Sequence, residues 1–227
     1  MTNQVKSKQR VAEHGEVFTA EREVKAMCDL VKQETERIDS RFLEPACGDG
    51  NFLAEVLSRK LAFVKKKYKK SAYDYERNSL LAVSSIYGVD ILLDNVIACR
   101  ERMFEIWDKE YKVVCKKECN DDTREAAKFI LNRNIVCGNA LSLRCVDEKG
   151  IDTNEPIVFS EWTFPFNDAR MQRKDYTFDE LLNKDDNSVK KNEGKKQTTM
   201  FGESPPDEEG KFLKQYISHY RRVKDNG

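Results

Sequence analysis

The run from Phe42 to Leu53 has the residue types and spacing of a ligand-binding loop. An apolar stretch ending at Glu44 leads into a small-residue turn with Gly48 and Gly50, and a helix-forming stretch follows. The glycines allow a tight turn and a close approach of the backbone to a ligand. Backbone N–H groups point outward at the start of a helix, where the helix dipole favours negative charge. The loop therefore suits a ligand with a carboxylate and ribose hydroxyls, and Glu44 can accept a positive group.

Two later segments place polar side chains at the ends of expected strands. Asp90 follows an apolar stretch, and a carboxylate at that position can accept both hydroxyls of a ribose. The same side chain could instead cap the next helix, and the two roles can coexist. Asn139 follows another apolar stretch, where an Asn turn is common.

The cofactor loop and three further segments resemble motifs of one enzyme family, the SAM-dependent amino-methyltransferases that act on DNA. Glu44–Leu53 reads Glu-Pro-Ala-Cys-Gly-Asp-Gly-Asn-Phe-Leu and resembles motif I, with Asp49 where a small residue is usual. The Phe18-Thr19 pair resembles motif X in its amino-terminal placement, although Phe18 could equally be a hydrophobic staple. The segments around Asp90 and Asn139 resemble motifs II and III, in the order that the family requires.

The resemblance covers about residues 11 to 166 and implies S-adenosyl-L-methionine (SAM) as the cofactor. It also implies a DNA adenine-N6 methyltransferase or a subunit of a restriction-modification system, and it places the side chain of Asn139 against the adenine amino group of the cofactor. The residues expected at the cofactor are Phe18, Thr19, Glu44, Ala46, Cys47, Gly48, Gly50, Phe52, Asp90, Ile91, Asn139 and Leu141.

Enzymes of this family carry a catalytic tetrapeptide, Asp/Asn/Ser-Pro-Pro-Tyr/Phe/Trp, after a fourth strand. The lone pair of an exocyclic amine is delocalised into the ring, so the enzyme flips the base, accepts hydrogen bonds from the amine and stacks an aromatic ring on the base. Ser204-Pro205-Pro206 is followed by Asp207 and lacks a strand before it. Phe164-Pro165-Phe166 has the strand and the aromatic rings without the Pro-Pro pair. Both are weak catalytic candidates.

The chain is therefore expected to be the cofactor-binding portion of a split or truncated methyltransferase. DNA would be bound mainly through a partner chain that carries the catalytic motif and the target-recognition domain. A basic stretch from Lys65 to Lys70 could contact phosphates, although such a run is usually a solvated helix face. Two alternatives stay open: a catalytically inactive regulatory subunit, and a methyltransferase that acts on a small molecule or a protein.

Hydrophobic periodicity indicates alternating strands and helices. Strands are expected at residues 38–45, 86–90, 134–141 and 157–164. Helices are expected at residues 20–32, 94–114 and 124–131, with one more helix that starts at residue 51 and a helix-like segment that ends at residue 85. Such alternation is typical of right-handed crossovers on a parallel sheet. The expected fold is α/β, a Rossmann-like methyltransferase with a doubly wound, mostly parallel sheet and a polar C-terminal extension.

Composition divides the chain into a polar leader (1–13), a SAM-binding domain (14–182), a polar linker expected to be disordered (183–210) and a C-terminal segment (211–227). Residues 212–223 are compatible with either a helix or a strand. Lysine and arginine balance aspartate and glutamate at 40 each, so DNA contact would need local patches.

The polar composition predicts a cytoplasmic protein. The mean hydropathy is -0.72, and no apolar run is long enough for a membrane span or a signal peptide. Seven scattered cysteines with two histidines predict reduced thiols and neither a disulfide framework nor a metal site.

Overall fold

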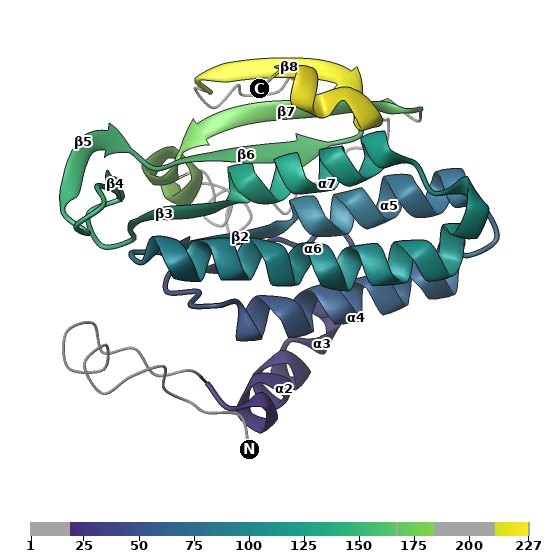
Figure 1. Cartoon of the computed structure of the whole chain (residues 1–227), viewed down its shortest axis with the longest axis horizontal. Helices are drawn as coiled ribbons and strands as arrows, with labels where there is room; N and C mark the ends of the chain where they lie inside the picture. Colours follow the sequence, from purple (N-terminus) through teal and green to yellow (C-terminus); the bar gives the residue numbers. More distant parts are fainter. Residues whose placement is uncertain (1–18, 167, 184–211, 227) are drawn as a thin grey trace, which may run out of the picture.

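The computed structural model describes residues 19–166, 168–183 and 212–226 of the chain, which form an α/β structure (Figure 1). The helices are α2 (Glu21–Leu30), α3 (Lys32–Thr35), α4 (Asn51–Tyr68), α5 (Ala72–Ser84), α6 (Leu93–Cys115) and α7 (Asp121–Asn134), with 3-10 helices η1 (Lys116–Glu118) and η2 (Tyr220–Asn226). Residues 178–183 are helical as well. The strands are β1 (Phe42–Glu44), β2 (Ile86–Asp90), β3 (Ile135–Asn139), β4 (Arg144–Val146), β5 (Asp152–Pro156), β6 (Val158–Thr163), β7 (Arg170–Thr177) and β8 (Lys214–His219).

The strands form two sheets. The first is a mixed five-stranded sheet in the order β1-β2-β3-β4-β5, in which β1, β2 and β3 are parallel and β4 and β5 add as antiparallel strands. The second is an antiparallel sheet in the order β6-β7-β8. The expected parallel core is present in β1–β3, whereas β4, β5 and β7 were not predicted.

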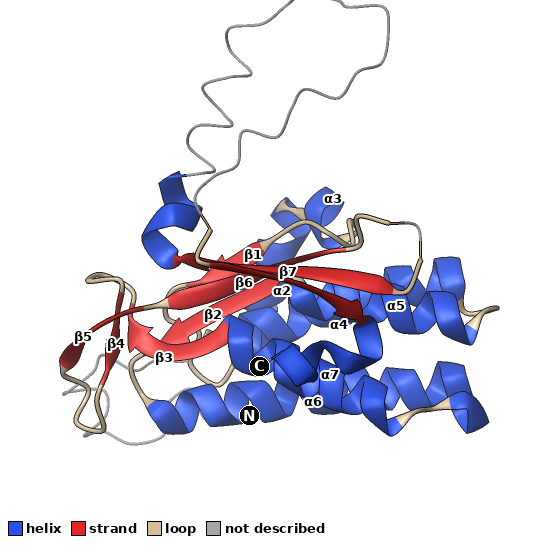
Figure 2. Cartoon of the chain, turned by 90° about the horizontal axis from the view of Figure 1, so that it is seen from above, coloured by secondary structure: helices blue, strands red, loops and turns tan. Residues whose placement is uncertain are grey.

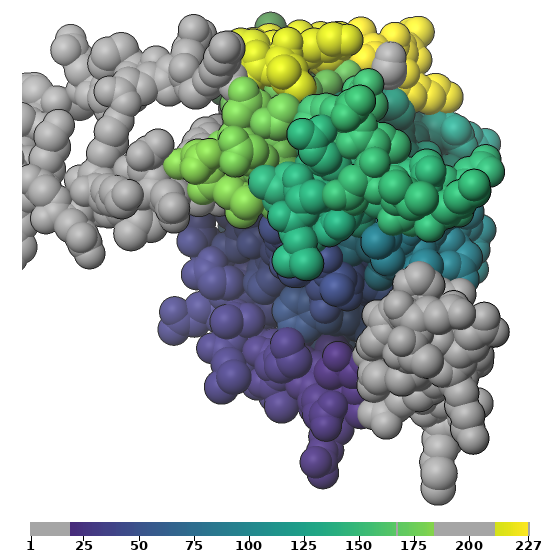
Figure 3. Space-filling model, turned by 90° about the vertical axis from the view of Figure 1, so that its left-hand side faces the viewer, coloured from purple at the N-terminus to yellow at the C-terminus, as the bar shows by residue number. Residues whose placement is uncertain are grey.

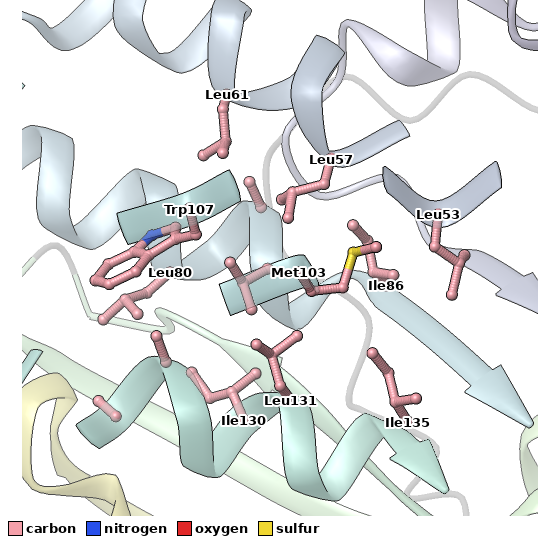
Figure 4. Close-up of a cluster of buried hydrophobic side chains, with 14 of the residues drawn as sticks. Leu53, Leu57, Leu61, Leu80, Ile86, Met103, Trp107, Ile130, Leu131 and Ile135 are labelled. Carbon is pink, nitrogen blue, oxygen red and sulfur yellow. The ribbon is translucent and has the colours of Figure 1, made fainter. Parts of the chain in front are cut away.

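The long helices α4 to α7 pack together on one side of the parallel strands (Figure 2). Their apolar faces enclose the main core, whose largest members are fully buried (Figure 4). The residues labelled there are Leu53, Leu57, Leu61, Leu80, Ile86, Met103, Trp107, Ile130, Leu131 and Ile135. This core fixes α4 and α6, the two helices that begin directly after β1 and β2.

The opposite face of β2 is covered by the second sheet and not by long helices. Tyr87 and Val89 point to this face and pack with Ile157, Phe159 and Phe178. The rings of Tyr87 and Phe159 meet edge to face at 5.4 Å, and the Tyr87 hydroxyl donates to the carbonyl of Ser160. The strand predicted at residues 157–164 is therefore present as β6, in a separate antiparallel sheet.

Strand β1 is shorter than the predicted strand at residues 38–45. The fully buried Lys60 of α4 donates from its Nζ to the carbonyls of Arg37 (2.8 Å), Ile38 (3.1 Å) and Ser40 (2.6 Å). Carbonyls that bond to an ammonium are turned out of a strand ladder, so pairing with β2 starts at Phe42.

Two helix starts also differ from expectation. Helix α2 begins at Glu21, one residue later than predicted, and Ala20 before it makes no side-chain capping bond. Helix α7 begins at Asp121, three residues earlier than predicted, because the Asn120 side chain accepts from the Asp122 N–H at 2.8 Å.

Residues 212–226 form β8 and η2 and pack into the structure. Their main anchor is Glu76 of α5, a fully buried carboxylate. It accepts hydrogen bonds from the hydroxyls of Tyr111 and Tyr220 and from the guanidinium of Arg221, whose Nη2 lies 2.6 Å away. A buried charge with this many donors is stable only while its partners are present. The carboxyl-terminal strand and turn are thus tied to the helical core.

Replacing Glu76 with Gln is expected to lower the free energy of unfolding by about 2 kcal/mol, because the buried side chain at position 76 loses its charge-assisted hydrogen bonds, including the pairing with the partly exposed Arg221. Urea denaturation followed by circular dichroism measures the loss. The matched control is Glu105→Gln on the exposed side of α6, which should change stability by less than about 0.5 kcal/mol. Equal effects of the two substitutions would contradict the anchoring role.

No helix in the described ranges is both long and apolar enough to cross a lipid bilayer.

Candidate functional site

A cavity of about 490 Å³ lies where β1, β2 and β3 end. In parallel α/β sheets, ligands bind at the carboxyl ends of the strands. Figure 3 views the molecule from the side on which these strand ends lie, with the purple α2 and blue α4 below the green β3–β5 region. The cavity is lined by Thr19, Glu44, Pro45, Ala46, Cys47, Gly48, Asn51, Phe52, Asp90, Ile91, Leu92, Asn95, Gly138, Asn139, Ala140 and Leu141.

The loop between β1 and α4 is a compact turn built on two glycines. Gly48 and Gly50 have φ angles of 53° and 86°, a region that residues with a side chain rarely adopt. The Gly50 N–H donates to the Cys47 carbonyl at 2.8 Å. A Cβ on Gly50 would lie 2.6 Å from the Cys99 sulfur, so the turn also needs glycine for space. The predicted turn and helix start are present.

Asp90 joins this loop to the start of α6. Its Oδ2 accepts from the Gly48 N–H at 2.8 Å, and its Oδ1 accepts from the Leu92 N–H at 2.9 Å and from Asn95 Nδ2 at 3.3 Å. Asp90 therefore lines the cavity and bonds next to the start of α6, but the residue that caps this helix is Leu92. A carboxylate has about four lone-pair directions, so Asp90 keeps capacity for one further donor.

Asp49, where this chain departs from the motif, pairs with a residue outside the loop. Its two oxygens meet Arg102 of α6 at 2.9 and 3.2 Å, and the same guanidinium donates to Asn51 Oδ1 at 2.6 Å. Asp49 is not among the cavity-lining residues, whereas Asn51 is. The Asp49 charge is thus neutralised on the α6 side of the loop.

Glu44 at the end of β1 has a carboxylate oxygen without a hydrogen-bond donor among the described residues. Its Oε2 is buried and accepts no hydrogen bond from any residue in the described ranges. Burial, with the nearby Asp90 charge as a smaller cause, raises the pKa of Glu44 from 4.5 to about 7. A cationic or hydrogen-donating ligand in the cavity would supply the missing partner.

Asn139 and Leu141 form the far rim of the cavity. Asn139 Oδ1 accepts from the Leu141 N–H at 3.0 Å, and its Nδ2 donates to Asp152 at 3.0 Å. The side chain thus makes the common Asn turn, and both ends of its amide already have protein partners. Leu141 is 97% exposed, so its apolar surface is available to a ligand or a covering chain.

Cys47 packs behind the loop. It is almost fully buried, and a Cβ on Gly88 would lie 3.0 Å from its sulfur. The neighbouring Cys99 thiol and burial raise the pKa of Cys47 strongly, so the thiol stays protonated and unreactive. Its role in the cavity wall is packing.

The structure brings ten of the twelve predicted cofactor residues to this one cavity. The other two are Gly50, which shapes the loop without lining the cavity, and Phe18, which lies outside the described residues. Pro45, Asn51, Leu92, Asn95, Gly138 and Ala140 line it but were not in the predicted set. Asn51 and Asn95 could have been found from the sequence, because each lies in the first turn of the helix that follows a predicted strand.

One of the two weak catalytic candidates lies away from the cavity. Phe164 lines a separate groove of about 980 Å³, together with Arg41 and Ser85, which directly precede β1 and β2. This groove lies at the amino ends of the strands, opposite the cavity. Phe164-Pro165-Phe166 therefore lies at the wrong end of the sheet to act on a ligand in the cavity.

The second candidate, Ser204-Pro205-Pro206, lies outside the described residues. Among the residues described, no group of three or more His, Cys, Asp and Glu side chains is arranged to hold a metal ion.

No family model, curated protein or solved structure matches the chain.

The raised pKa of Glu44 predicts a pH-dependent cost of folding. Between about pH 4.5 and 7 the folded chain keeps a proton that the unfolded chain releases, so this carboxyl makes stability fall as pH rises. Glu44→Gln should remove this pH dependence. At about pH 8 its free energy of unfolding should exceed that of the wild type by up to about 3 kcal/mol. At about pH 4.5 most of this advantage should be gone.

Urea denaturation of both proteins across this pH range measures the difference between them, in which contributions from other titrating groups cancel. A constant difference between the two proteins at every pH would contradict a buried, unpartnered Glu44.

Proposed function

We propose that the chain binds SAM in the cavity at the ends of β1–β3 and is the cofactor-binding portion of a site-specific DNA adenine-N6 methyltransferase of a restriction-modification system. The fold is accordingly proposed to be Rossmann-like, of the methyltransferase type. The observation that carries the proposal is convergence: motif-like segments centred on Glu44–Phe52, Asp90 and Asn139 are far apart in sequence and line one cavity.

The cavity fits the polar groups of SAM. Its volume of about 490 Å³ lies within the range of roughly 300–1,000 Å³ that is usual for cofactor sites. Glu44, with its unpartnered buried oxygen, would hold the methionyl ammonium. The start of α4, behind the two glycines, suits the methionyl carboxylate.

The nucleoside part has matching partners as well. The remaining acceptor capacity of Asp90 suits a ribose hydroxyl. Phe52, Ile91 and Leu141 supply apolar surface for the adenine ring. Because Asn139 already has partners for both ends of its amide, it would shape this end of the cavity and is not assigned the adenine amino group. When bound, SAM supplies an electrophilic methyl group on its sulfonium sulfur.

The proposal that DNA is the substrate rests on the resemblance of the motifs. The proposal of a partner chain rests on the chemistry of amine methylation. Methylation of an exocyclic amine needs acceptors for its N–H groups and an aromatic ring against the base. Phe164-Pro165-Phe166 lies at the opposite end of the sheet from the cavity. We therefore assign the grip on the target base, and most of the contact with DNA, to a partner chain.

Isothermal titration calorimetry of the purified chain with SAM tests the cofactor assignment. The wild type should bind, and Asp90→Ala should lower the affinity at least about tenfold, because the loop loses its link to α6 and the ribose loses an acceptor. Asp179→Ala, an exposed acid outside the cavity, is the matched control and should bind like the wild type. A folded wild-type chain that gives no heat with SAM would sink the proposal.

Transfer of a labelled methyl group from SAM to unmethylated DNA tests whether a partner chain is needed to bind the target base. The chain alone is expected to show no transfer, because the described cavity lacks a grip on the target amine. Robust methylation by the chain alone would contradict the need for a partner. It would also exclude the alternative of an inactive regulatory subunit.

A further inference from the structure

Asn51, the first residue of α4, has a side chain held at one end only. It lines the cavity, and its Oδ1 accepts from Arg102 Nη1 at 2.6 Å. Its Nδ2 donates to no residue in the described part of the chain. The amide thus has a satisfied acceptor and an unused pair of donor hydrogens at the cavity wall.

Arg102 determines which end of the amide faces the ligand. A guanidinium has only donors, so the atom of Asn51 that contacts it must be the oxygen, and the NH₂ group must take the other position. Arg102 cannot easily move away, because Asp49 holds it with two bonds of 2.9 and 3.2 Å. Asp49 and Arg102 therefore fix Asn51 as a donor toward the cavity.

We propose that Asn51 is a specificity residue that donates a hydrogen bond to the carboxylate of the bound cofactor, and that Arg102 and Asp49 are its positioning residues. The proposal deepens the proposed function and rests on it. Glu44 lines the same cavity and is acidic, so one ligand with an ammonium and a carboxylate on the same carbon can bond to both side chains. Glu44 and Asn51 would together recognise the ammonium and the carboxylate at the amino-acid end of the cofactor.

The departure of this chain from the usual loop pattern supports the assignment. An unpaired Asp49 beside the start of α4 would repel a carboxylate there. The two-bond pairing with Arg102 cancels this charge, and the same guanidinium also orients Asn51. The acidic residue in the loop is thus compatible with an anionic ligand group only because α6 carries Arg102.

The test is the isosteric substitution Asn51→Asp, with SAM and decarboxylated SAM as the two probes. The introduced carboxylate can still accept from Arg102, so the loop should keep its structure and urea stability, but its second oxygen would face the cavity as an acceptor. SAM affinity measured by calorimetry is expected to fall about 30-fold, whereas affinity for decarboxylated SAM should change less than about threefold.

Three results distinguish a failure of the proposed function from a failure of the role of Asn51. No binding of SAM to the wild type overturns the proposed function and this inference together. Wild-type binding with equal effects of Asn51→Asp on both probes overturns the inference alone. If Asn51→Asp does not fold, Asn51→Ala takes its place, and a loss confined to SAM supports the donor role.

Arg102→Gln tests the positioning role without changing the cavity wall. This variant releases the amide of Asn51 and leaves Asp49 unpaired, so SAM should be weakened and decarboxylated SAM largely unaffected. Hydrogen exchange of the Cys47–Leu53 segment without ligand gives a second readout, and it should become faster. Unchanged exchange and unchanged discrimination between the probes would overturn the role of Arg102.

Discussion

The hydrogen bonds of the Asp90 carboxylate are the constraint on which the candidate site depends. One oxygen accepts from the Gly48 N–H in the loop after β1, and the other accepts from the Leu92 N–H directly before α6. The crossover units that follow β1 and β2 are thereby joined at the carboxyl ends of these strands. The second brace, from Arg102 to Asp49, comes from α6. The loop geometry is thus set from the end of β2 and from α6, and the core beneath them keeps both points in place.

The sequence predicted best what depends on local chemistry. Strand β2, helix α6 and the turn at Gly48–Gly50 follow from short-range periodicity and from backbone angles that only glycine adopts easily. The convergence of Asp90 with the loop was predictable because the carboxyl ends of neighbouring parallel strands meet at one edge. These are consequences of pattern and topology and need no knowledge of particular side-chain contacts.

The features that the sequence could not predict depend on partners distant along the chain. Lys60 shortens β1 by binding three carbonyls, although a lysine in a helix usually points to solvent. Strand β7 is polar along much of its length, and it is stabilised by pairing on both sides, so its periodicity is weak. The role of Asp49 was also hidden, because its partner Arg102 lies 53 residues further along the chain.

The buried carboxylate of Glu76 has a consequence for how the chain is made. Its ion-pair partner Arg221 is 145 residues later in the sequence. During synthesis at roughly 5–20 residues per second, the ribosome needs on the order of ten seconds to reach that partner. The packing around Glu76, in which Tyr220 and Arg221 are partners, therefore forms only after these late residues have been added. The loop between β1 and α4 is synthesised well before this anchor can form.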